Sequence, residues 1–293
     1  MRVLTKAYVE AKGAQIHYAA AGTSGPVLVL LHETPRSWTA FGPALPHLSA
    51  FSQVIALDTP GYGGSDALPD GASFDEYADT IAEAIDQLVD GPCWLVGVHT
   101  GAGLALNILQ RKRLRVEGMI LTGLPVYGIG GAAPSLEKIA PPIPFAPDGA
   151  HLPQIAGYLR QKWGTGYSPS ALHDACGALM GCFDRYGAGY AAIFRHVPGN
   201  LKGVTCPTLF IVCEHDVLRD HDLAAARLIP HSEIVWAYGI GRDLPWSAPR
   251  WYAGAIRTFL ARNASGDATR QSRAPPRRMP KQNDRPSHTT RGT

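Results

Sequence analysis

Residues 95–103 read LVGVHTGAG, and this stretch decides the fold. It joins an apolar run, typical of a buried strand, to residues 100–111, whose apolar side chains repeat with a helical period. Gly97 and Gly101 stand two residues before and two residues after His99. A sharp strand-to-helix turn leaves no room for side chains at these two positions. The pattern therefore predicts a tight turn with His99 exposed at its apex.

A shift of the pattern by one residue would put Thr100 at the apex instead. Val98 would then occupy one of the crowded positions, where a small residue is needed. We therefore favour His99 over Thr100.

Outward from this turn, short apolar runs alternate with amphipathic stretches, which indicates an α/β fold with a mostly parallel sheet flanked by helices. Lys12-Gly13-Ala14 separates the first two runs and predicts an opening hairpin. Helices are expected over 74–89, 100–111 and 250–260. We expect eight strands, at residues 7–11, 15–20, 27–31, 54–57, 94–98, 118–122, 208–213 and 233–238.

Residues 125–200 interrupt the alternation after the sixth expected strand. They begin with a Gly/Pro-rich segment and continue with helical patterns at 152–162, 170–182 and 185–196. An insertion of this size between two core strands predicts a helical lid. The expected organisation is a core of residues 1–124 and 201–262, a lid of residues 125–200 and a tail of residues 263–293.

The tail differs in composition from the rest of the chain. Residues 264–293 carry seven Lys or Arg against two Asp, with many prolines and almost no aliphatic residues, so we expect a disordered basic extension. Without it the chain is mildly acidic, and we expect no nucleic-acid partner. The apolar runs are too short to cross a membrane, and the N-terminal residues lack a signal-peptide pattern, which favours the cytoplasm. The five cysteines form no CxxC pair and are expected as reduced thiols.

Two further motifs accompany the turn at His99. Residues 32–38, HETPRSW, resemble the HGxP segment that follows the third strand of α/β-hydrolases. Residues 58–65, DTPGYGGS, resemble the D-x-x-G-x-G-x-S turn of the epoxide-hydrolase and haloalkane-dehalogenase branch. The turn at His99 resembles the nucleophile elbow of the same family. Together the three motifs resemble the α/β-hydrolase pattern, and the resemblance covers roughly residues 5–262. The resemblance implies an α/β-hydrolase fold.

The resemblance also assigns a catalytic triad, in which this chain departs from the family. The nucleophile is usually serine, aspartate or cysteine, and His99 takes that position. Residues 207–216, PTLFIVCEHD, put Asp216 at the acid position, and residues 241–249, GRDLPWSAP, put Arg242 at the histidine position. The triad is therefore degenerate.

These replacements change the chemistry that the site can perform. Arg242 stays protonated, so it cannot be a general base, but it can form a bidentate pair with Asp216 or bind an anionic group. The helix N-terminus next to His99 disfavours a positive charge on the ring, so we expect a neutral imidazole near pH 7. That ring can act as a base or as a nucleophile, and Asp216 can orient it if the two are in contact.

The resemblance further implies an oxyanion hole formed by the backbone amides of Glu33 and Thr100. The Glu33 carboxylate is either a second acid/base group or points to solvent. His32, Trp38 and His196 are candidates for contact with substrate, although the resemblance gives His32 a role in supporting its loop. Trp38 either lines the site or packs, and a lone histidine such as His196 is often a surface residue.

Three functions remain open. The first is an enzyme that cleaves an ester, lactone or related bond of a small, partly apolar molecule, with His99 as base or nucleophile. The second is a lyase, cyclase or decarboxylase on the same fold, and the third is a protein that binds a small ligand without turnover. We favour an enzyme without a cofactor or a metal, as a monomer or a homodimer.

Overall fold

The computed structural model describes residues 4–163 and 168–264. The predicted tail, apart from its first two residues, lies outside the described residues. The last helix, which was expected to end at residue 260, extends to residue 264.

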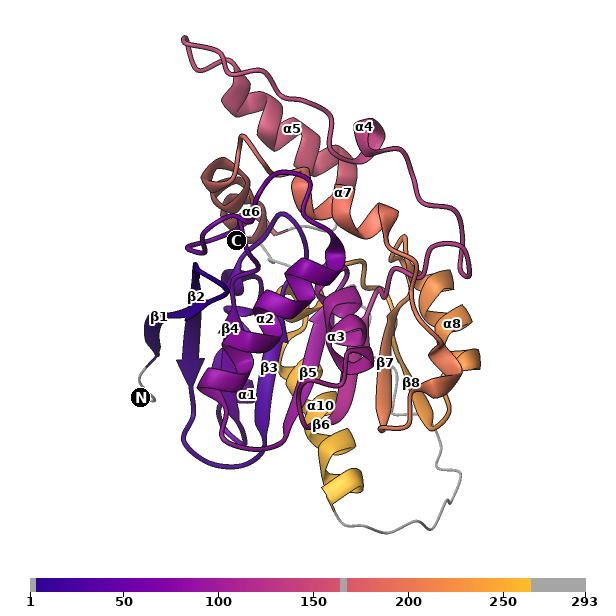
Figure 1. Ribbon diagram of the computed structural model, residues 1–293. Helices are drawn as coiled ribbons and strands as arrows, with labels where there is room; N and C mark the ends of the chain where they lie inside the picture. The colour runs from indigo at the N-terminus through magenta and orange to yellow at the C-terminus, as the bar shows by residue number, and fades with distance from the viewer. Residues whose placement is uncertain (1–3, 164–167, 265–293) are drawn as a thin grey trace, which may run out of the picture.

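An eight-stranded sheet forms the centre of the molecule, as predicted (Figure 1). The strand order is β1-β2-β4-β3-β5-β6-β7-β8, and β2 runs antiparallel to both of its neighbours, β1 and β4, whereas the remaining pairs are parallel. The strands are β1 (Thr5–Ala11), β2 (Ala14–Ala21), β3 (Val27–Leu31), β4 (Gln53–Leu57), β5 (Cys93–Val98), β6 (Val116–Thr122), β7 (Thr208–Cys213) and β8 (Ser232–Ala237).

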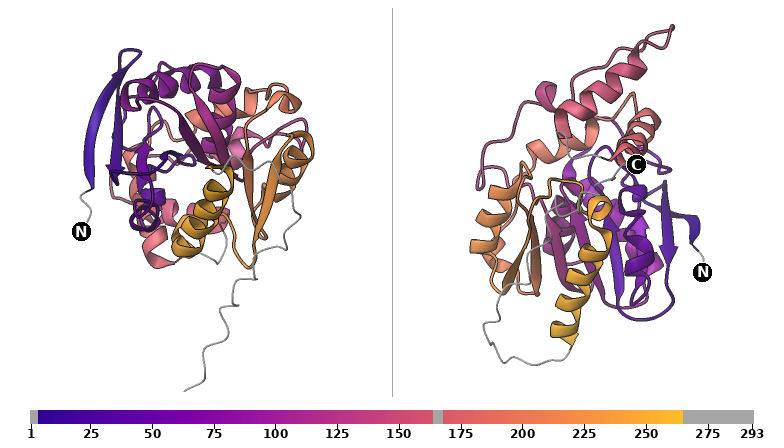
Figure 2. Two further views of the ribbon diagram at one scale, coloured as in Figure 1. Left: turned by 90° about the horizontal axis from the view of Figure 1, so that it is seen from below. Right: turned by 180° about the vertical axis from the view of Figure 1, so that it is seen from behind.

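Helices cover both faces of the sheet, and Figure 2 (left) shows the strands between the two helical layers. Alternate residues of β3 build two separate apolar cores, since Val29 and Leu31 pack on one face and Leu28 and Leu30 on the other. The first core receives side chains from α2 (Phe74–Leu88), α3 (Thr100–Gln110) and α8 (Arg219–Leu228); the second receives them from α1 (Leu45–Leu48) and α10 (Pro249–Ala264).

The insertion between β6 and β7 is helical and lies over the end of the sheet at which β5 and β7 end (Figure 1). Two hydrogen bonds tie it to core loops: the Tyr190 hydroxyl donates to Thr34 O at 2.6 Å, and the Gly189 amide donates to Tyr62 Oη at 2.8 Å. Its elements are α4 (Leu136–Ile139), α5 (His151–Trp163), α6 (Pro169–Gly181), α7 (Ala188–Arg195) and η3 (Leu201–Gly203).

Several helices were not predicted. The turns η1 (Trp38–Phe41), α1, α4 and α9 (Leu244–Ser247) have four residues each, too few to show a period. In the longer α8, the buried positions are His221, Asp222 and Ala225. Because two of these are polar, a search for apolar periodicity does not find this helix.

Candidate active site

The turn between β5 and α3 has the predicted shape. A Cβ on Gly97 would lie 2.5 Å from the Ala102 Cα, and one on Gly101 would lie 2.0 Å from the Leu31 carbonyl oxygen. Between these glycines, His99 adopts a φ of 49°, a conformation that residues other than glycine rarely take. The turn therefore holds His99 at its apex. Its side chain differs from the expectation because it is 4% exposed, covered by neighbouring charged groups.

Both ring nitrogens of His99 contact charged side chains. Nε2 lies 2.7 Å from Asp216 Oδ2, and Nδ1 lies 2.6 Å from Arg242 Nη2. A guanidinium group has only N–H donors, so Nδ1 must accept this hydrogen bond. The remaining hydrogen then sits on Nε2 and is donated to Asp216. In this geometry the imidazole is neutral, and Arg242 occupies its lone pair.

The acid follows β7, and both of its oxygens have partners. Asp216 Oδ2 accepts from His99, and Oδ1 accepts from the Leu218 amide at 2.8 Å. Burial raises the pKa of this carboxyl group, whereas the hydrogen bond from His99, the charge of Arg242 and the Leu218 amide act against burial and lower it. The contacts therefore run in the order Asp216–His99–Arg242, whereas the sequence had also allowed a bidentate pair between Arg242 and Asp216.

Glu33 faces the site and not the solvent, which decides between the two orientations left open by the sequence. Its Oε2 lies 4.0 Å from His99 Nδ1 and 3.8 Å from Arg242 Nε. Its Oε1 lies 3.5 Å from Arg36 Nη1. Within residues 4–163 and 168–264, Oε2 is buried and accepts no hydrogen bond. An acceptor that a ligand can use therefore stands beside the imidazole.

Arg36 joins this loop to the helical insertion. Its guanidinium is fully buried and donates to Asp174 of α6 at 2.7 Å, and it lies 3.9 Å from Asp243. Burial raises the pKa of Asp243 to about 8, although the charge of Arg36 opposes the shift. The loop that carries Glu33 thus lies between the core and α6, and the ion pair between Arg36 and Asp174 joins it to α6.

The predicted oxyanion-hole residues lie next to each other. Thr100 begins α3, where backbone amides have no acceptor within the helix. Its hydroxyl accepts from the Thr34 amide at 2.6 Å and donates to Thr34 Oγ1 at 3.0 Å. The loop that follows β3 is thereby fixed to the start of α3. Their role as an oxyanion hole stays a prediction.

The three residues expected to contact substrate lie in other surroundings. His32 Nδ1 donates to the Glu33 carbonyl at 2.9 Å, and Nε2 accepts from the Thr59 amide at 2.9 Å, so the ring supports the loop. The Trp38 ring packs on the core and lies 5.6 Å from the Lys6 ammonium. His196 packs on Phe74, with ring centroids 5.0 Å apart. The structure does not bring their side chains to His99.

Besides Arg36, two residues of the site were missed by the sequence analysis. Gly123 follows β6, and a Cβ there would lie 2.4 Å from His99 Cδ2, so this glycine makes room for the ring. Lys162 of α5 donates to Tyr158 Oη at 2.8 Å and Tyr190 Oη at 2.6 Å. Burial, followed by the charge of Arg242, lowers the pKa of Lys162 to about 6. A lysine on an insertion helix gives no signal of burial in a single sequence.

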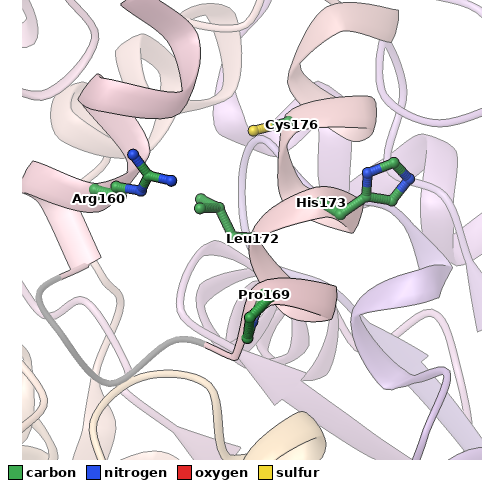
Figure 3. Close-up of a pocket in the computed structure, with 5 residues that line it drawn as sticks. All are labelled: Arg160, Pro169, Leu172, His173 and Cys176. Carbon is green, nitrogen blue, oxygen red and sulfur yellow. The ribbon is translucent and has the colours of Figure 1, made fainter. Parts of the chain in front are cut away.

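Other features of the described residues lie away from His99. A groove in the insertion is lined by Arg160 of α5 and by Pro169, Leu172, His173 and Cys176 of α6 (Figure 3). Across residues 4–163 and 168–264, three or more His, Cys, Asp or Glu side chains nowhere gather closely enough to hold a metal ion. No helix in the same residues has the length and apolar character needed to span a bilayer.

Comparison with known proteins agrees with this architecture. The model of the alpha/beta hydrolase family matches residues 28–255. The chain belongs to the alpha/beta hydrolase family.

Relatives with curated names include enzymes of two kinds. Epoxide hydrolase 3 of Mus musculus is 26% identical over 244 residues, covering 74% of this chain and 65% of the mouse protein. A haloalkane dehalogenase of Sphingobium indicum is 33% identical over 122 residues, covering 39% of this chain and 40% of that enzyme. The chain spans less than two thirds of the length of these relatives.

Among solved structures, the enol-lactonase of Burkholderia xenovorans LB400 has a TM-score of 0.76 at 18% identity, covering 87% of this chain and all of that one. At this identity, the similarity shows the fold alone.

Proposed function

We propose that this protein is a hydrolase of small, partly apolar esters, lactones or related compounds, with His99 as the general base. The observation that carries the proposal is the neutral His99 ring, whose Nε2–H is held by Asp216 at 2.7 Å. A carboxylate that orients an imidazole and stabilises its protonated form is the usual support for a histidine base. The epoxide hydrolases and dehalogenases among the relatives make hydrolysis the first reaction to test.

In the proposed reaction, a water molecule donates its proton to His99 Nδ1 and its oxygen attacks the substrate carbonyl. The amides of Glu33 and Thr100 stabilise the oxyanion that forms. The protonated ring then lies between two carboxylates, those of Asp216 and Glu33. Glu33 Oε2 is 4.0 Å from Nδ1. Arg242 must first move off Nδ1, and the Glu33 carboxylate lies 3.8 Å from its Nε.

We propose further that the helical insertion acts as a lid. His99, Glu33 and Arg36 are each less than a tenth exposed, so substrate reaches them only if the groups above them move. Asp174 and Tyr190 link the insertion to the loop of residues 33–36 and are the contacts that opening would break.

The test is the turnover of a panel of esters and lactones by His99→Ala and His99→Gln. General-base catalysis contributes about 10²- to 10⁴-fold, so we expect a loss of that size in kcat. His215→Ala is the matched control, because His215 adjoins Asp216 in sequence and its side chain is 66% exposed. Full turnover by both His99 variants on a substrate that the wild type hydrolyses would overturn the proposal.

One observation favours the alternative of ligand binding without turnover. Arg242 already occupies the His99 lone pair at 2.6 Å, as expected if the site never uses a base. Prolonged incubation with a bound ligand, followed by its recovery, separates the two functions. Unchanged ligand with measurable affinity would favour binding alone, and chemically altered ligand would favour the enzyme.

A further inference from the structure

Hydrolysis of an ester requires a base that takes a proton from water and a group that stabilises the departing oxygen. Different residues of the site can meet these two needs. The base removes a proton from water, and the oxygen that departs must then receive a proton or be stabilised as an anion. His99 serves the first need. For the second, the groups near its Nδ1 are Arg242 at 2.6 Å and Glu33 at 4.0 Å.

The described side chains near His99 Nδ1 are not suited to deliver a proton to the departing oxygen, and Asp243, which holds a proton below about pH 8, faces Arg36 at 3.9 Å instead. Arg242 does not lose its proton in proteins. Glu33 lies between Arg36 at 3.5 Å and Arg242 at 3.8 Å, and as a carboxylate it has no proton to give. Lys162 Nζ contacts Tyr158, Tyr190 and the Ile139 carbonyl, and with a pKa lowered to about 6 it has no proton to give near pH 7.

The imidazolium formed during the reaction is also a poor donor. Its Nε2–H is held by Asp216 at 2.7 Å, and its new Nδ1–H faces Glu33 Oε2. That oxygen is buried and accepts no hydrogen bond from the described residues. The hydrogen-bonded Asp216 and the charge of Glu33 at 4.0 Å both stabilise the imidazolium and make it a weaker proton donor.

Arg242 offers the other solution, because a guanidinium stabilises an oxyanion without giving up a proton. Its side chain is 10% exposed, and in such surroundings a charge–charge contact is stronger than in water. Since Nη2 touches Nδ1, an oxygen that enters between them meets the cation and the base together.

We infer that the substrate is an ester or lactone of an acidic hydroxyl, a phenol or an enol, whose oxygen departs as an anion paired with Arg242. The inference rests on the proposed function. In the step, the water oxygen bonds to the carbonyl carbon and the carbon–oxygen bond to the phenol or enol breaks. The water proton goes to His99 Nδ1, and the bonding electrons leave with the departing oxygen. Alkyl esters, whose alkoxides are far less stable anions, are excluded.

The first experiment compares phenyl acetates of graded leaving-group acidity with ethyl acetate. We expect the wild type to hydrolyse the aryl esters and to leave ethyl acetate intact. Arg242→Gln should lower kcat for 4-nitrophenyl acetate by about 10²- to 10³-fold, the usual loss when one oxyanion donor is removed. The loss should grow as the leaving phenol becomes less acidic. Arg250→Gln, on the exposed start of α10, is the matched control.

A second experiment reads the Arg242 contact without turnover. 4-Nitrophenol is titrated with the protein at a pH at which the free phenol is mostly protonated. We expect the yellow phenolate to appear on binding to the wild type and to the Arg250→Gln control, and to be lost with Arg242→Gln. Arg242→Lys, which keeps a positive charge, should recover part of the signal if the glutamine variant does not fold.

The outcomes separate this inference from the proposed function. If His99→Ala abolishes ester hydrolysis but Arg242→Gln does not, or if 4-nitrophenol binds as the neutral phenol, the inference fails and the proposed function stands. If no aryl ester is hydrolysed while the phenolate binds through Arg242, the anion site stands and the proposed function fails. Equal rates on phenyl acetate and ethyl acetate would also overturn the inference.

Discussion

Two histidines stand at the ends of neighbouring parallel strands, His32 after β3 and His99 after β5, and both are almost completely buried. Among the described residues, the nitrogens of His32 contact backbone groups, the Glu33 carbonyl and the Thr59 amide. Those of His99 contact the charged side chains of Asp216 and Arg242. Burial therefore does not distinguish a structural histidine from a functional one. The hydrogen-bond partners of the two rings distinguish them, because backbone partners are fixed, whereas charged side chains can be displaced by a ligand.

The largest effect on stability is expected at His32. His32→Ala leaves the buried Thr59 amide without its acceptor, which costs about 1–3 kcal/mol, whereas the Glu33 carbonyl keeps the hydrogen bond from the Arg36 amide at 2.8 Å. His99→Ala should cost about 1 kcal/mol, the value of an ordinary hydrogen bond, because Asp216 and Arg242 can then pair with each other. Chemical denaturation of both variants measures the difference. A larger loss for His99→Ala would contradict the division between the two residues.

The next effect tests whether the His99 ring needs its present position. Gly123→Ala puts a methyl group 2.4 Å from His99 Cδ2, at a φ of 65°. We expect about 2 kcal/mol of destabilisation from overpacking, together with a loss of turnover. Gly128→Ala is the control: its φ is 83°, but nothing lies within 4 Å of the added Cβ. Only the cost of the backbone conformation should remain there, and turnover should be unchanged. Equal effects in the two variants would show that the ring has room to move.

A smaller effect on stability is expected from Lys162, whose pKa is influenced by the charges of Arg242 and Glu33. Burial, followed by the charge of Arg242, lowers its pKa to about 6. Between pH 6 and about 10 the unfolded chain therefore binds a proton that the folded protein does not bind. The contribution of Lys162 to stability should rise with pH in this window by at most about 1.4 kcal/mol per unit, and Lys162→Met should remove that contribution. Unfolding free energies measured from pH 6 to 9 check this, and identical slopes for both proteins would count against it.

Asp243 should have the opposite effect over a lower pH range. Burial raises its pKa to about 8, against the influence of Arg36. Between about pH 4 and 8 the folded protein holds a proton that the unfolded chain has released. The contribution of Asp243 to stability should therefore fall as the pH rises, by at most about 1.4 kcal/mol per unit. Asp243→Asn should remove this contribution; a slope equal to that of the wild type would mean that the carboxyl group is ionised when folded.

The fold was predictable because its signals are local. The strands at 27–31 and 208–213 were predicted at their observed bounds, since each is a continuous apolar run buried on both faces. The turn at His99 was predictable for the same reason, because the steric need for Gly97 and Gly101 can be recognised in five consecutive residues. Helix α8 was not, because His221 and Asp222 lie on its buried face.

The site was predictable in its members but not in its order of contacts. β5 and β7 run parallel with only β6 between them, so the strand order places His99 and Asp216 at the same edge of the sheet. The order Asp216–His99–Arg242 depends on side-chain length. An imidazole at the apex is long enough to contact Asp216 through Nε2, and its Nδ1 is then left to contact Arg242. The roles of Arg36, Gly123 and Lys162 depend on contacts between segments far apart in the chain, for which one sequence holds no signal.

The position of the hydrogen on the His99 ring is the decisive test of its proposed role as a general base. The ¹⁵N NMR spectrum of histidine-labelled protein near pH 7, with His99→Gln used for assignment, reports which ring nitrogen carries hydrogen. We predict hydrogen on Nε2 and an unprotonated Nδ1 that accepts a hydrogen bond, with the Nδ1 signal shifting in Arg242→Gln. Hydrogen on Nδ1, in either the neutral or the cationic ring, would contradict the account, because Nδ1 could then neither accept from Arg242 nor take a proton from water.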